Sequence, residues 1–159
     1  MSLIAHHFIA AAVNPFDLKA ALLARHAQHP VIVHFPIALF IASAFFETLA
    51  IWRKQLVFAA VAYYNLLCAA VTIPFTIATG LAAWQWQLEG ARLKGNLRLH
   101  LICAIITGTI ILILCWKRSR LRARNESPRL AYFAVMAIGL LMITLTGHLG
   151  GILSGVESP

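Results

Sequence analysis

No formally charged side chain interrupts residues 130–153, which read LAYFAVMAIGLLMITLTGHLGGIL. An α-helix needs about 20 predominantly apolar residues to cross the hydrocarbon core of a bilayer. A helix on the core of a water-soluble protein keeps a polar stripe toward solvent, and this stretch has none. Residues 130–153 are therefore predicted to form a transmembrane helix.

Three further apolar segments have the length of a membrane span. They cover residues 31–52, 55–83 and 97–116, and the first contains a single acidic residue, Glu47. The chain has 159 residues, of which 61% are hydrophobic and 11% charged, whereas roughly 25% are charged in a typical soluble domain. The sequence predicts one all-α domain, a four-helix transmembrane bundle.

The basic residues are distributed unequally between the two ends of the predicted spans. Eight of the 13 Lys and Arg residues lie between spans one and two or between spans three and four. Cytoplasmic loops carry the excess of Lys and Arg in membrane proteins. We therefore expect a multi-pass protein of the bacterial inner (cytoplasmic) membrane, with both termini extracytoplasmic. The same placement argues against nucleic acid as the partner of this +8 chain.

Residues 1–30 are predicted to be an extracytoplasmic segment that precedes a transmembrane domain of residues 31–153. Asn14 and Pro15 have the residue types of a helix N-cap and first helical turn. Apolar side chains then recur at helical spacing with polar ones elsewhere, so we expect an amphipathic helix on the outer membrane surface. Residues 154–159 form a short tail.

Histidines gather near the outer ends of the predicted spans. His29 and His34 lie at the outer start of the first span, His100 at the outer start of the third, and His148 near the outer end of the fourth. Because consecutive spans run in opposite directions, these positions meet at a similar depth. Ionisable groups inside a membrane usually face the bundle interior and are functional candidates. If the helix continues through Pro30, His29 points about 140° away from His34, so the two could not easily bind one iron.

The residue types at this level suit a haem site. Imidazole is the usual protein ligand of haem iron and also suits copper and zinc. We take His34, His100 and His148 as the candidate iron or metal ligands, with His29 as an alternate. No CxxCH motif for covalent haem occurs, so the expected cofactor is haem b. Small residues that would let a porphyrin approach the backbone are Gly80, Gly147, Gly150 and Gly151.

Two other interpretations of the histidines stay open. They could form a polar network that holds the outer helix ends together in a cofactor-free structural or anchor subunit. They could instead bind copper or zinc, although no carboxylate lies at their depth to act as a general base in hydrolysis. Glu47, near the inner end of the first span, is expected to reach the membrane interface or to meet Arg53. The sequence shows no nucleophile–base pair that would indicate an enzyme.

Two motifs resemble a known family. Residues 29–38 read HPVIVHFPIA and residues 147–151 read GHLGG, and together with Thr79-Gly80 and His100 they are similar to the domain-of-unknown-function 2231 family of predicted bacterial membrane proteins. The resemblance covers about residues 29–151. It implies a four-helix membrane domain, sometimes joined to or encoded near Rieske proteins and cytochromes. Family members often continue past the double glycine into a longer polar tail with another histidine or tyrosine, whereas residues 155–159 read GVESP here.

These observations predict a b-type cytochrome-like electron-transfer subunit of the membrane. All candidate ligands lie at the outer level, so the sequence does not indicate two haems stacked across the bilayer. Burial among apolar helix faces would tune the reduction potential of the haem. Electron exchange is expected at the outer face, with a quinol or an extracytoplasmic redox protein.

Overall fold

The computed structural model describes residues 25–87, 90 and 92–155, which form four long α-helices. The helices are α2 (Arg25–Arg53), α3 (Leu56–Gln87), α4 (Gly95–Ala123) and α5 (Leu130–Leu153). All four are long and apolar enough to cross a membrane, which confirms the predicted fold class. The predicted surface helix that begins at Asn14 lies outside the described residues.

Two of the helices extend well beyond the predicted spans. Helix α2 begins at Arg25 and continues through Pro30 and Pro36, and α4 continues to Ala123 rather than ending at Trp116. A helix of 29 residues, the length of α4, is about 44 Å long at 1.5 Å per residue. Since the hydrocarbon core is about 30 Å thick, the helix ends reach into the headgroup layers on both sides.

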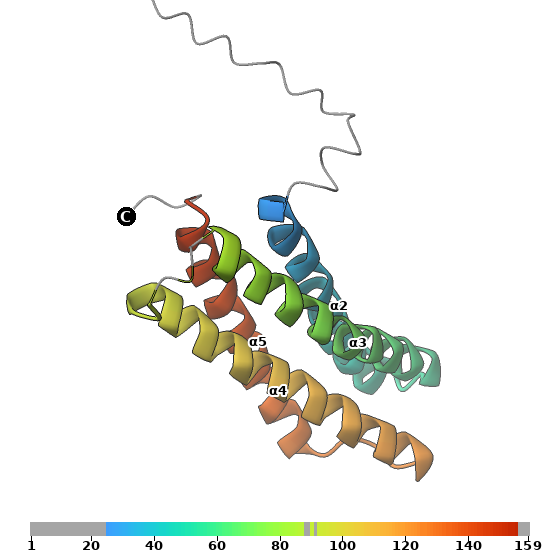
Figure 1. The fold of residues 1–159 in the computed structure, drawn as a ribbon. Helices are drawn as coiled ribbons and strands as arrows, with labels where there is room; N and C mark the ends of the chain where they lie inside the picture. The colour runs from blue at the N-terminus through green and yellow to red at the C-terminus, as the bar shows by residue number, and fades with distance from the viewer. Residues whose placement is uncertain (1–24, 88–89, 91, 156–159) are drawn as a thin grey trace, which may run out of the picture.

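Consecutive helices run antiparallel, and two hairpins make up the bundle (Figure 1). Only Lys54 and Gln55 separate α2 from α3, and Lys54 makes the reversal with a left-handed φ of 52°. Packing is most extensive within the hairpins α2–α3 and α4–α5, less so between α3 and α4, and slight between α2 and α5. The starts of α2 and α4 therefore share one end of the bundle with the last turns of α3 and α5.

A compact apolar core joins the two hairpins. Phe40 of α2, Leu66 of α3 and Leu114 of α4 are completely buried. Gly139 of α5 lies against this core so closely that a Cβ atom there would come within 2.8 Å of the Phe40 Cζ atom. Small residues at such contacts let membrane helices approach each other, since packing rather than the hydrophobic effect drives their association.

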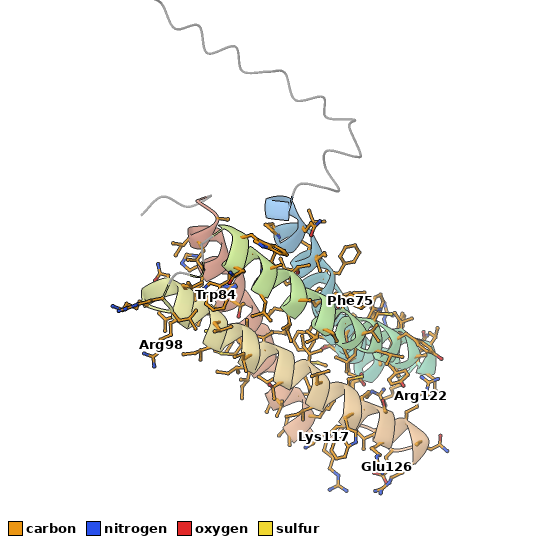
Figure 2. All side chains as sticks on the ribbon, in the orientation of Figure 1. Phe75, Trp84, Arg98, Lys117, Arg122 and Glu126 are labelled. Carbon is orange, nitrogen blue, oxygen red and sulfur yellow. The ribbon has the colours of Figure 1, made fainter. Side chains whose placement is uncertain are left out.

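The outer surface of the bundle is apolar along its middle and charged at its ends. Large side chains such as Phe45, Ile105 and Leu141 are exposed in the middle of their helices, as expected where lipid rather than water surrounds the protein. Figure 2 shows Arg98 toward one end and Lys117 toward the other. The charge distribution and the exposed apolar belt agree with four membrane-spanning helices.

Candidate functional site

The first candidate site lies at the end of the bundle where α2 and α4 begin and α3 and α5 end, here called the histidine end. The four histidines singled out in the sequence, His29, His34, His100 and His148, belong to these helix ends. Two of them are half-buried against neighbouring helices, and two are exposed.

His29 of α2 is fixed against α3. Its Nδ1 atom lies 3.1 Å from the Thr79 hydroxyl oxygen. That hydroxyl donates to the backbone carbonyl of Phe75 at 3.0 Å or of Thr76 at 3.1 Å, so its oxygen accepts the bond from Nδ1. A Cβ atom on Gly80 would come within 3.0 Å of the His29 Cε1 atom. The imidazole therefore occupies space that only a glycine at position 80 leaves open.

His100 of α4 is fixed against α5 in a similar way. Its Nδ1 atom lies 3.1 Å from the Thr146 carbonyl oxygen. Because a carbonyl can only accept, Nδ1 carries the proton and donates it. A Cβ atom on Gly150 would lie 3.3 Å from the His100 Cε1 atom, so this ring also packs over a glycine. The Thr146 hydroxyl lies 3.3 Å from that of Thr107, which extends the polar contact into α4.

The two anchored imidazoles come from different hairpins and lie at the same end of the bundle. Both are half-buried. With Nδ1 committed as a donor, each neutral ring keeps its lone pair on Nε2. A hydrogen bond that fixes the tautomer and orientation of a histidine is the usual outer-shell support of a metal-ligating imidazole. Together His29 and His100 form a pair of oriented bases at the histidine end.

His34 and His148 do not join this pair. Both are exposed, and the ring of His34 contacts the carbonyl of Pro30 in its own helix. Since α2 continues as a helix through Pro30, the five residues between His29 and His34 turn them about 140° apart, as expected from the sequence. No three or more His, Cys, Asp or Glu side chains gather around a possible metal position within the described residues. The predicted trio of His34, His100 and His148 therefore does not form a shared metal site in this structure.

The glycines predicted to accommodate a cofactor fall into two groups. Gly80 and Gly150 contact the anchored imidazoles, as described above. Gly147 is exposed and has no neighbouring atom within 4 Å of the position its Cβ would take, and Gly151 is half-buried. Only Gly80 and Gly150 are thus placed to shape the surroundings of the histidine pair.

A second polar site, an ion pair buried near the opposite end of the bundle, was not predicted. The Arg118 Nε atom donates to the Glu47 Oε2 atom at 3.0 Å, and the two side chains are 7% and 2% exposed. The expected partner of Glu47, Arg53, is instead exposed and stacks on the Trp52 ring at 4.7 Å. The prediction was wrong because α4 is longer than expected, so that Arg118 belongs to a helix rather than to a loop.

No periodic signal in the sequence locates Arg118, because apolar residues surround α4 on all sides. In the structure Arg118 follows the buried residues Ile111 and Leu114 by seven and four positions, the spacing of one helix face. Two further polar atoms are buried in this half of the bundle. The Ser43 hydroxyl and the Tyr132 hydroxyl have no hydrogen-bond partner among the described residues.

The helices and the two polar sites define a multi-pass α-helical membrane protein with ionisable groups inside the bundle. The chain belongs to the family described as predicted membrane protein (DUF2231), whose model matches residues 25–156. That match confirms the resemblance drawn from the HPVIVHFPIA and GHLGG motifs. No curated protein and no solved structure is significantly similar to this chain.

Proposed function

We propose that the protein is a membrane electron-transfer subunit that binds haem b, and that His29 and His100 would be the residues that hold its iron. The observation that carries the proposal is the pair of half-buried imidazoles from separate hairpins, each held at Nδ1 by an oxygen acceptor of the next helix. Two imidazole ligands from facing helices are a donor set that haem iron accepts. His34 and His148, which are exposed, are weaker candidates.

The residues around His29 and His100 fit a haem group. Thr79 and the Thr146 carbonyl hold the two rings in the tautomer that leaves Nε2 for iron. Gly80 and Gly150 keep side-chain bulk away from the ring edges. When bound, the haem would supply one-electron transfer, and apolar helix faces would tune its potential by excluding water. Its position at the histidine end supports exchange with a quinol or with an extracytoplasmic redox protein.

A cofactor-free structural subunit is the second candidate, and one observation favours it. The bond from His29 to Thr79 joins α2 to α3, and the bond from His100 to Thr146 joins α4 to α5. Such interhelical bonds in membrane proteins contribute about 0.6–2 kcal/mol each. On this alternative the histidines stabilise the hairpins and need no ligand.

Visible spectroscopy of the detergent-purified protein separates the two candidates. Haem binding predicts a reduced-minus-oxidised haem spectrum in the wild type, and its loss in His29→Ala and in His100→Ala. His34→Ala is the matched control, because it removes an exposed imidazole from the same helix as His29 and is expected to retain the spectrum. A wild type that shows no haem band, even after incubation with haem, would refute the proposal.

A further inference from the structure

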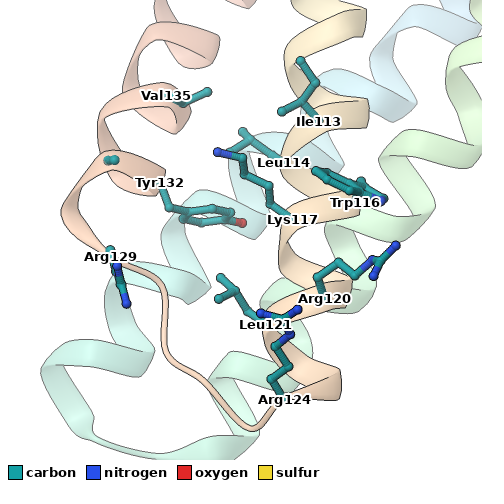
Figure 3. Close-up of a pocket in the computed structure, with 11 residues that line it drawn as sticks. Ile113, Leu114, Trp116, Lys117, Arg120, Leu121, Arg124, Arg129, Tyr132 and Val135 are labelled. Carbon is teal, nitrogen blue, oxygen red and sulfur yellow. The ribbon is translucent and has the colours of Figure 1, made fainter.

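A hollow opens between α4 and α5 at the end of the bundle opposite the histidines, here called the basic end. Its volume is about 400 Å³. Helix α4 contributes Lys117 and Arg120 to its lining, and Arg124, the C-cap of α4, and Arg129, the N-cap of α5, also line it. Figure 3 shows Lys117 and Tyr132 in the gap between α4 and the first turn of α5, with Arg124 and Arg129 near the ends of the loop that joins the two helices.

The cations of the hollow are aligned and carry a net positive charge. Lys117, Arg120 and Arg124 follow one another by three and four positions, so they occupy one face at the end of α4 over about 10 Å. Arg120 also stacks over Trp116 at 5.6 Å. Within residues 25–87, 90 and 92–155 the only ion pair joins Arg118 to Glu47. The four cations of the hollow are therefore outside ion-pair distance of Glu126, the acidic residue of the loop that joins α4 and α5.

Tyr132 contributes its ring to the wall of the same hollow. Figure 3 shows this ring extending from α5 toward α4. The side chain is only 5% exposed, and its hydroxyl oxygen is buried from solvent without a hydrogen-bond partner among the described residues. The ring, and not the hydroxyl, therefore faces the hollow.

The first turn of α5 is also suited to an anion. Its N-cap, Arg129, makes no side-chain capping bond, and the first turn contains no acidic residue. The Tyr132 N–H donates to the Arg129 carbonyl at 2.9 Å, so the N–H groups before it and the positive end of the helix dipole are the part of that turn suited to a negative ligand. This feature adds to the cations rather than replacing them.

The opposite wall of the hollow is apolar. Ile113 and Val135 line it on the side toward the middle of the membrane, and Ile113 is 44% exposed. A free phosphate would leave this apolar wall without an apolar partner, whereas the acyl chain of a lipid would cover it. Basic pockets between transmembrane helices bind anionic lipid headgroups for the same reason.

We propose that the hollow between α4 and α5 binds an anionic phospholipid. Its phosphate lies against Lys117, Arg120 and Arg124, and an acyl chain follows Ile113 toward the middle of the membrane. The proposal is independent of haem binding, because it concerns the opposite end of the bundle.

The test compares phosphatidylglycerol with phosphatidylcholine, added to the full-length protein in detergent and measured by native mass spectrometry. We expect phosphatidylglycerol to bind wild type at least about tenfold more tightly, since each charge-assisted contact is worth about a factor of ten. Changing Lys117, Arg120 and Arg124 together to Gln should abolish that preference. The matched control changes Arg92, Lys94 and Arg98 to Gln at the histidine end and should preserve it.

One further measurement sharpens the test. Soluble glycerol phosphate at millimolar concentration should fail to displace the lipid. Equal losses in both triple variants, full binding by the Lys117, Arg120 and Arg124 variant, or displacement by glycerol phosphate would overturn the assignment.

Discussion

Removing one partner of the Glu47–Arg118 pair should destabilise the bundle more than any other single charge change. The two side chains lie 3.0 Å apart with exposures of 2% and 7%, so neither charge can reach water when the other is lost. Breaking a buried ion pair by removing one partner costs about 3–5 kcal/mol. An unpaired charge costs up to about 2.5–3.5 kcal/mol on insertion scales, the value for the centre of a span, so most of the expected loss comes from burial within the bundle.

The two single variants should not be equal. Glu47→Gln leaves the Arg118 guanidinium buried, and a guanidinium cannot lose its proton in a protein. Arg118→Met leaves a carboxylate that can be neutralised by taking up a proton, which limits the cost. We therefore expect Glu47→Gln to fall near about 5 kcal/mol and Arg118→Met nearer about 3 kcal/mol. The double variant should lose much less than the sum, because no charge remains buried.

The measurement is a double-mutant cycle on the free energy of unfolding, followed by tryptophan fluorescence during denaturation by sodium dodecyl sulfate in mixed micelles at pH 7. Arg53→Met is the matched control, since Arg53 is exposed at the end of α2, and it should change the stability by less than about 0.5 kcal/mol. Single-variant losses that add within about 0.5 kcal/mol in the double variant would show that the pair is not coupled. A larger loss for Arg118→Met than for Glu47→Gln would refute the reasoning on protonation.

Two smaller changes test the helix contacts by the same unfolding assay. Gly139→Ala should lower the free energy of unfolding by about 1–3 kcal/mol, because the new Cβ would lie 2.8 Å from Phe40. Gly147→Ala is the control: Gly147 has open space around it, so the change should be neutral or slightly stabilising. Equal effects of the two changes would contradict the packing argument. Thr79→Val removes the acceptor of His29 and should cost about 0.6–1.7 kcal/mol, so an unchanged unfolding curve would show that this bond contributes nothing.

The depth of the histidines follows from the sequence, but the direction of each side chain does not. His29, His34, His100 and His148 belong to the helix ends expected for them, because alternating spans determine which ends meet. Apolar residues surround each helix on all sides, so the sequence contains no polar stripe that would reveal the inner face. Contacts with Thr79 and Thr146, on other helices, orient His29 and His100.

The Glu47–Arg118 pair likewise separates what the sequence determines from what helix packing decides. The sequence placed Glu47 inside a span, which the length of the apolar segment determines, but it assigned Arg118 to a loop. The membrane tolerates a longer α4 because the charge is neutralised by a residue 71 positions away in the chain. Such a partner cannot be identified until the helices are packed.

The number of spans and their antiparallel order were determined by the sequence alone, since apolar length relative to the bilayer is a property of each segment by itself. The rotation of each helix about its own axis was decided only by the tertiary structure. That rotation depends on close contacts between helices, such as Gly139 against Phe40, because lipid and protein interior are equally apolar and give a helix no preferred face.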